Sequence, residues 1–162
     1  MFIQCSEQGL RLHAALNKLT DGHIMASTNV PEYKIILDLN TQIKSIIVDA
    51  FTMSIEERDY LLESVSRIDH VESIYILGQQ PESNETQTIL FVRFPKVCIF
   101  CEDEGQLALR WALDTAEKYQ ASGDLCIKNG QKDIGRKHFE RGMLLFDRLD
   151  VLIDSVRRRE KR

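Results

Sequence analysis

The chain has 162 residues, of which 43% are hydrophobic and 28% are charged, with eight glycines and three prolines. This composition is typical of a globular protein and excludes collagen-like, low-complexity and wholly disordered chains. The formal net charge of −4 argues against a protein that binds nucleic acid through a basic surface. We therefore expect no nucleic-acid partner.

The N-terminus has no basic start followed by an apolar run, so it does not resemble a secretory signal. No stretch approaches the roughly 18 apolar residues of a membrane span. We expect a cytoplasmic protein without membrane association, in which the four cysteines are reduced. A nuclear location is the alternative, because basic residues crowd the C-terminus: Arg157, Arg158, Arg159, Lys161 and Arg162.

The first third of the chain mixes helical and extended patterns. Apolar spacing predicts a helix over residues 5–19, with Ser6 as its N-cap. Residues 20–33 have the composition of a loop. The apolar run at residues 33–39 predicts a buried strand, whereas residues 43–51 fit either a strand or a helix.

The next segments alternate between the two types. Ser54 and Glu57 form a capping box, which opens a helix with an apolar face. Residues 71–77 and 97–100 predict strands, and residues 89–94 fit a strand or the end of a helix. Strands that alternate with helices predict an α/β unit over residues 1–101, with a small, mostly parallel sheet and flanking helices.

From residue 102 the pattern is helical throughout. One helix ends at Asn129 and Gly130, which suit a left-handed cap, and a second begins near Lys132. Two helices joined by a short turn form an antiparallel hairpin. We therefore expect residues 102–162 to form a helical hairpin packed on the α/β unit.

Residues 116–147 of this hairpin carry the spacing of large and small residues seen in one known repeat. Tyr119 and Phe139 stand at two aromatic positions, Gly123 and Gly142 at two small positions, and Gly130 at the turn. This segment resembles a single tetratricopeptide repeat, in which small residues let two helices approach closely.

The resemblance departs from the family pattern at two positions. Ser122 replaces the usual Leu, and Asp147 replaces the usual closing Pro. There is also one copy, although about three repeats are needed to bury a continuous core. The hairpin must therefore pack on the α/β part, on another copy or on a partner. A generic helical hairpin is the alternative interpretation.

The order of strands and helices also resembles a receiver or flavodoxin-type layout, with Asp38 and Asp49 expected at strand ends. These two carboxylates could line a ligand site, since α/β proteins bind ligands there. A receiver also needs a Lys at a later strand end, whereas Lys96 precedes its strand. The resemblance is therefore one of topology and implies no phosphotransfer.

Cys98 and Cys101 form a C-x-x-C pair inside a predicted strand. A redox pair should lie at a helix N-terminus, where the thiol pKa falls. Positions i and i+3 of a strand point to opposite faces, so we expect buried or unreactive thiols. Cys5, Cys126 and the four histidines supply no second ligand pair for zinc. We expect neither a metal nor a cofactor.

The first hypothesis for function is a non-enzymatic interaction module, because the hairpin resembles a repeat and no catalytic motif is present. Its partner would be a protein or a peptide. The second is a small nucleotide- or metabolite-binding protein, possibly enzymatic, with Asp38 and Asp49 in the site. The third is a structural homodimer joined through the last helix, where apolar residues repeat at intervals of seven: Phe139, Phe146 and Ile153, and also Leu149 and Val156.

Overall fold

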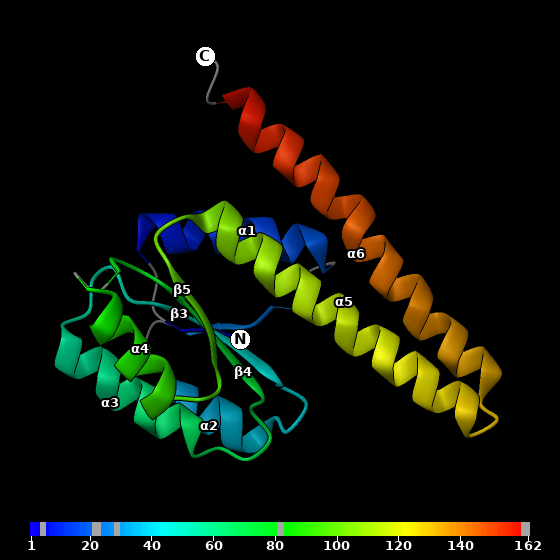
Figure 1. Ribbon diagram of the computed structural model, residues 1–162, viewed down its shortest axis with the longest axis horizontal. Helices are drawn as coiled ribbons and strands as arrows, with labels where there is room; N and C mark the ends of the chain where they lie inside the picture. Colours follow the sequence, from blue (N-terminus) through cyan, green and yellow to red (C-terminus); the bar gives the residue numbers. More distant parts are fainter. Residues whose placement is uncertain (4–5, 21–23, 28–29, 81–82, 160–162) are drawn as a thin grey trace.

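A computed structural model describes residues 1–3, 6–20, 24–27, 30–80 and 83–159. These residues form an α/β fold with a five-stranded, wholly parallel sheet (Figure 1). The strands are β1 (Phe2–Ile3), β2 (Ala26–Ser27), β3 (Ser45–Asp49), β4 (Ser73–Leu77) and β5 (Val97–Cys101). The helices are α1 (Glu7–Leu19), α2 (Val30–Leu39), α3 (Ile55–Ser66), α4 (Asn84–Arg93), α5 (Glu104–Lys128) and α6 (Lys132–Arg159).

The strand order is β2-β1-β3-β4-β5, which is the flavodoxin-like order of doubly wound sheets. Figure 1 shows α2, α3 and α4 on one face of the sheet and α1 and α5 on the other. The direction of chain connection reverses between β1 and β3. The sequence left the strand order open, because it depends on contacts between distant segments.

Side chains that alternate along the central strands build two hydrophobic cores. Ile46 and Val48 of β3 pack in the core under α2, α3 and α4. Ile47, between them, packs with α1, α5 and α6 on the opposite face. All five residues of β4 are buried, as expected for a strand covered on both faces.

Local signals in the sequence place several helix starts correctly. The Ser6 hydroxyl accepts a hydrogen bond from the backbone N–H of Gly9, at 3.0 Å, and begins α1. Ser54 and Glu57 form the expected capping box at the start of α3, with bonds of 3.2 and 2.8 Å. The ambiguous segment at residues 89–94 belongs to α4, which ends at Arg93.

The strand predicted at residues 33–39 is wrong, because this segment lies in α2. Tyr33 and Leu37 are fully buried one helical turn apart, whereas Ile35 and Leu39 are exposed. The loop expected over residues 20–33 is wrong in part, because this segment contains β2 and the start of α2. Residues 21–23 and 28–29 of the same segment lie outside the described residues. The prediction also missed β1, at the N-terminus.

The hairpin of α5 and α6 forms a third part of the molecule, and it shares a core with the sheet. Leu107 and Trp111 of α5 and Leu145 and Leu149 of α6 are buried in the same cluster as α1 and the sheet. The end of α6 extends beyond the rest of the molecule (Figure 1). Within the described residues, no helix combines the length and apolar character needed to cross a membrane.

Candidate functional site

The two helices of the hairpin cross closely at small residues. A Cβ atom on Gly123 would lie 2.9 Å from two ring atoms of Phe139 and 3.1 Å from the carbonyl oxygen of Gly135. A Cβ atom on Gly135 would lie 2.8 Å from the carbonyl oxygen of Gly123. All three distances are shorter than ordinary contacts, so these two positions require glycine. Gly142 is different, because its nearest neighbours would lie 3.6 Å away.

The turn between the helices is a left-handed cap. Gly130 has φ of +80°, which side chains other than glycine adopt at a cost. Its N–H donates to the carbonyl of Ile127, and the N–H of Gln131 donates to that of Cys126, at 3.0 and 2.8 Å. The predicted turn at Asn129 and Gly130 is therefore confirmed, and it fixes α6 antiparallel to α5.

One face of the hairpin carries a groove of about 350 Å³, which we call the outer groove. Its lining is mostly apolar, and two of its side chains are strongly exposed, Met143 at 68% and Phe146 at 42%. The residues of the outer groove are Ala116, Glu117, Gln120, Phe139, Gly142, Met143 and Phe146. Among the hairpin residues singled out from the sequence, Phe139 and Gly142 lie in this groove.

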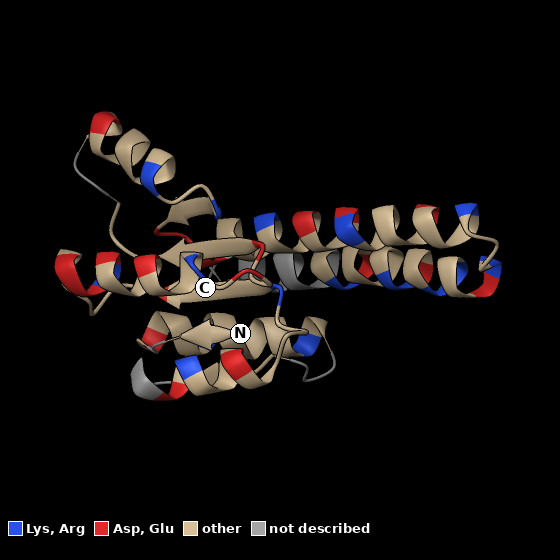
Figure 2. Ribbon diagram, turned by 90° about the horizontal axis from the view of Figure 1, so that it is seen from below, with Lys and Arg blue, Asp and Glu red and all other residues tan. Residues whose placement is uncertain are grey.

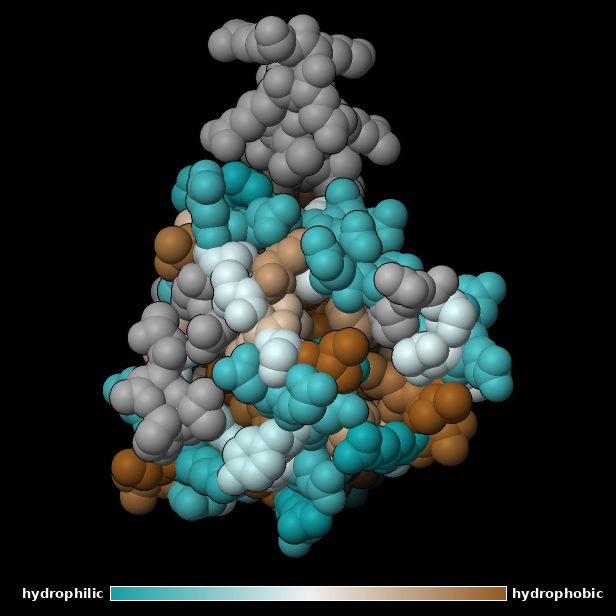
Figure 3. Space-filling view, turned by 90° about the vertical axis from the view of Figure 1, so that its left-hand side faces the viewer, coloured by the Kyte–Doolittle hydropathy of each residue, from teal (hydrophilic) through white to brown (hydrophobic). Residues whose placement is uncertain are grey.

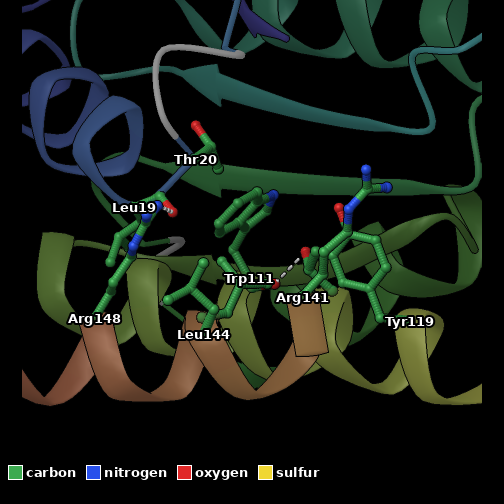
Figure 4. A pocket seen from close by; sticks show the side chains of 9 residues that line it. Leu19, Thr20, Trp111, Tyr119, Arg141, Leu144 and Arg148 are labelled. Atoms are coloured by element: carbon green, nitrogen blue, oxygen red, sulfur yellow. Dashed lines mark hydrogen bonds between the residues drawn. The ribbon is translucent and has the colours of Figure 1, made fainter. Parts of the chain in front are cut away.

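The opposite face of the hairpin bounds a larger cavity of about 550 Å³, which we call the inner cavity (Figure 4). Three elements line it: the end of α1 and the two hairpin helices. Its residues are Leu19, Thr20, Trp111, Thr115, Tyr119, Arg141, Leu144, Leu145 and Arg148. Along each hairpin helix these residues are offset from those of the outer groove by about half a turn, so the two hollows lie on different faces.

Two contacts support the walls of the inner cavity. Nη1 of Arg148 donates a hydrogen bond of 2.9 Å to the carbonyl oxygen of Leu19, which ties α6 to the end of α1. Tyr119, an aromatic position of the repeat pattern, lies with its ring 6.0 Å from that of His138. Tyr119 lines the inner cavity and Phe139 lines the outer groove, so these two aromatic residues do not share a hollow.

The charges of the hairpin do not form a surface of one sign. Figure 2 shows basic and acidic residues interspersed along both helices. Several are paired on the helix surface, such as Arg136 with Glu140 at 2.9 Å. The side chains of Arg157, Arg158 and Arg159, and all of Lys161 and Arg162, lie outside the described residues, so the role of the basic terminus stays a prediction.

The structure separates the two carboxylates that the sequence suggested for a ligand site. Asp49 lies at the end of β3, beside the point where the sheet reverses, and its exposed fraction is 0%. Its carboxylate accepts hydrogen bonds from the backbone N–H groups of Ser6 and Phe51, and it contacts Gly9. Asp38 was expected at a strand end, but it lies on the exposed surface of α2. The two residues therefore do not form one site.

The carboxyl ends of the strands have a cavity of their own, of about 420 Å³. Figure 3 looks onto this edge of the molecule, where polar areas surround smaller apolar ones. The one charged residue that lines this cavity among the described residues is Arg58, which pairs with Asp59 at 2.8 Å and lies over the ring of Phe100. The guanidinium of Arg58 is therefore already engaged within the fold.

The two thiols of the C-x-x-C pair have different surroundings in β5. Cys98 is the extra residue of β5 at the irregularity in its pairing with β4. Its side chain is exposed, whereas the strand position suggested a buried thiol. Cys101 is buried at the end of β5, and burial raises its thiol pKa to about 11. Among the described residues, no three His, Cys, Asp or Glu side chains are grouped to hold a metal ion.

No pattern in the sequence indicated the inner cavity. The available signals were weak: Trp111 is the one tryptophan of the chain, and Arg141 and Arg148 repeat at an interval of seven on one helix.

Comparisons with protein-family models, with curated proteins and with solved structures found no significant match to this chain.

Proposed function

We propose that the protein is a protein-binding module whose hairpin receives an amphipathic helix of a partner in the outer groove. The observation that carries the proposal is the exposure of Met143 and Phe146 beside a hollow between two long helices. Exposed apolar side chains grouped around a hollow are typical of interaction surfaces. The resemblance to a repeat that binds proteins supports the same function.

A helix is the partner element that fits this shape. Two antiparallel helices leave a long trough between them, and a third helix can fill it with side chains spaced three and four residues apart. Gly142 has no side chain at the bottom of the trough, which deepens it. An extended strand would find no open sheet edge in this part of the molecule.

The charge at the groove suggests that the partner helix is basic. Among the described residues, Glu117 is the one charged residue that lines the outer groove, and it is exposed. In the described part of the chain the carboxylate of Glu117 has no ion pair or hydrogen bond. A Lys or Arg beside the apolar stripe of the partner would pair with it.

A photocrosslinking experiment tests the proposal. A benzoyl-phenylalanine placed at Met143 should crosslink in cells to one segment of a partner, which mass spectrometry identifies. A synthetic peptide of that segment should gain helicity on binding, and Met143→Lys should raise its Kd at least about tenfold. Leu125→Lys is the matched control, because Leu125 is exposed on the same hairpin outside the groove.

Two results would count against this function. Equal binding of the peptide to both lysine variants would show that the peptide does not bind in the outer groove. A crosslink to the α6 segment of a second copy, together with a dimer mass by light scattering, would instead favour the structural homodimer. The α6 segment is itself a candidate for the helix that binds the outer groove, because its sequence joins Leu152, Ile153 and Val156 to a basic end.

A further inference from the structure

The inner cavity is lined by polar groups that can donate hydrogen bonds and that lack acceptors. The guanidinium of Arg141, the hydroxyl of Tyr119 and the indole N–H of Trp111 all border it. Within the described residues, none of these three groups has a hydrogen bond or an ion pair. Figure 4 shows the three side chains extending from the hairpin toward the layer of the sheet.

Among the described residues, no carboxylate lines the inner cavity, although acidic residues outnumber basic ones in the whole chain. Arg148 has a structural role, since it bonds the carbonyl of Leu19 and closes one end of the cavity. It also places a positive charge at the C-terminus of α1, where the helix dipole is negative. Arg141 is therefore the cation that a ligand would meet.

Apolar side chains form much of the remaining lining of the inner cavity. Trp111 is 8% exposed, and Leu144 and Leu145 lie on the facing helix. A volume of about 550 Å³ is within the range of small-molecule sites, which combine apolar walls with a few polar groups. A ligand for this cavity should therefore have an anionic group and an aromatic or apolar group.

We propose that the inner cavity binds a small phosphate ester that carries an aromatic group. Arginine binds phosphate through two parallel hydrogen bonds, and the phenol and indole groups can donate to the remaining acceptor positions of the terminal oxygens. A phosphomonoester has three terminal oxygens, which suit these three donor groups better than the two oxygens of a carboxylate. The aromatic group would lie against Trp111 and the leucine side chains.

Trp111 reports the occupancy of the cavity without a label, because the chain contains no other tryptophan. The test titrates the full chain with phenyl phosphate and with adenosine monophosphate, and follows the fluorescence of Trp111. Phenol, adenosine and inorganic phosphate are the matched controls. Both esters should change the emission with saturation, and each control should bind at least about tenfold more weakly.

Variants then place the anion within the cavity. Arg141→Gln should raise the Kd of both esters about tenfold or more, and Tyr119→Phe should raise it by a smaller factor. Arg136→Gln makes the same change of charge on the same helix outside the cavity, and it should leave the Kd unchanged. Circular dichroism checks that each variant retains its helices.

Three results would overturn the proposal. The first is that neither ester changes the emission at millimolar concentration. The second is that a neutral control or inorganic phosphate binds as tightly as the esters do. The third is that Arg141→Gln and Arg136→Gln bind the esters equally, which would place the anion elsewhere on the molecule.

Discussion

The carboxyl edge of the sheet and the helical hairpin differ in how their polar groups are used. In doubly wound sheets, ligands bind at the carboxyl edge where the strand order reverses. Here Asp49 occupies that place, but backbone N–H groups already bind its carboxylate. On the hairpin, Arg141 and Glu117 have no partners among the described residues. Polar groups engaged within the fold contribute to folding, whereas unengaged ones remain open to ligands.

The contrast between the carboxyl edge and the hairpin depends most on Asp49, where we expect a substitution to have the largest effect on stability. Asp49→Ala removes a fully buried carboxylate and leaves the N–H groups of Ser6 and Phe51 without their acceptor. We expect a loss of about 3 kcal/mol in the free energy of unfolding, measured by urea denaturation. Asp38→Ala is the control, with an expected change within about 0.5 kcal/mol, because Asp38 is exposed. Equal stability of the two variants would mean that Asp49 is free for a ligand, and the contrast between edge and hairpin would fail.

A substitution in the hairpin should have a smaller effect on stability. Gly123→Leu places a side chain against Phe139 and the backbone of Gly135, and we expect a loss of about 2 kcal/mol from overpacking. Gly142→Ala should be neutral or slightly stabilising, because its methyl group meets ordinary contact distances and alanine favours helix. Thermal unfolding followed by circular dichroism measures both. If Gly123→Leu unfolds like the wild type, the close crossing of α5 and α6 is not what holds the hairpin together.

The sequence predicts best the elements whose signals are local. β4, β5 and the hairpin follow from apolar spacing and from the cap at Gly130. The segment at residues 33–39 was misassigned because its apolar run suits both a strand and a buried helix. The helix forms because Tyr33 and Leu37 reach the core together, which only the tertiary structure decides. β1 and β2 are two residues each, too short for any pattern.

The site was predictable in part. The small residues of the hairpin could be read from spacing, and so could the position of Asp49 at a strand end. That the carboxylate of Asp49 is engaged could not be predicted, because Ser6 lies 43 residues away in the chain. The inner cavity was also beyond prediction, since α1 and α6 meet there across 129 residues, between Leu19 and Arg148. Patterns within one helix cannot show which distant side chains share a cavity.

The smallest expected effect concerns the thiols of β5, and it tests whether the carboxyl edge is chemically inert. Burial raises the thiol pKa of Cys101 to about 11, so at pH 8 only about one molecule in a thousand holds a thiolate there. Partial burial also raises the thiol pKa of Cys98, which is nevertheless exposed. Alkylation of the native protein with iodoacetamide at pH 8, followed by mass spectrometry, should therefore modify Cys98 several-fold faster than Cys101. The rate at Cys101 should rise about tenfold per pH unit below pH 11, because the thiolate is the nucleophile. Faster modification of Cys101, or a disulfide between the two in a non-reducing digest, would show that this edge holds a reactive group after all.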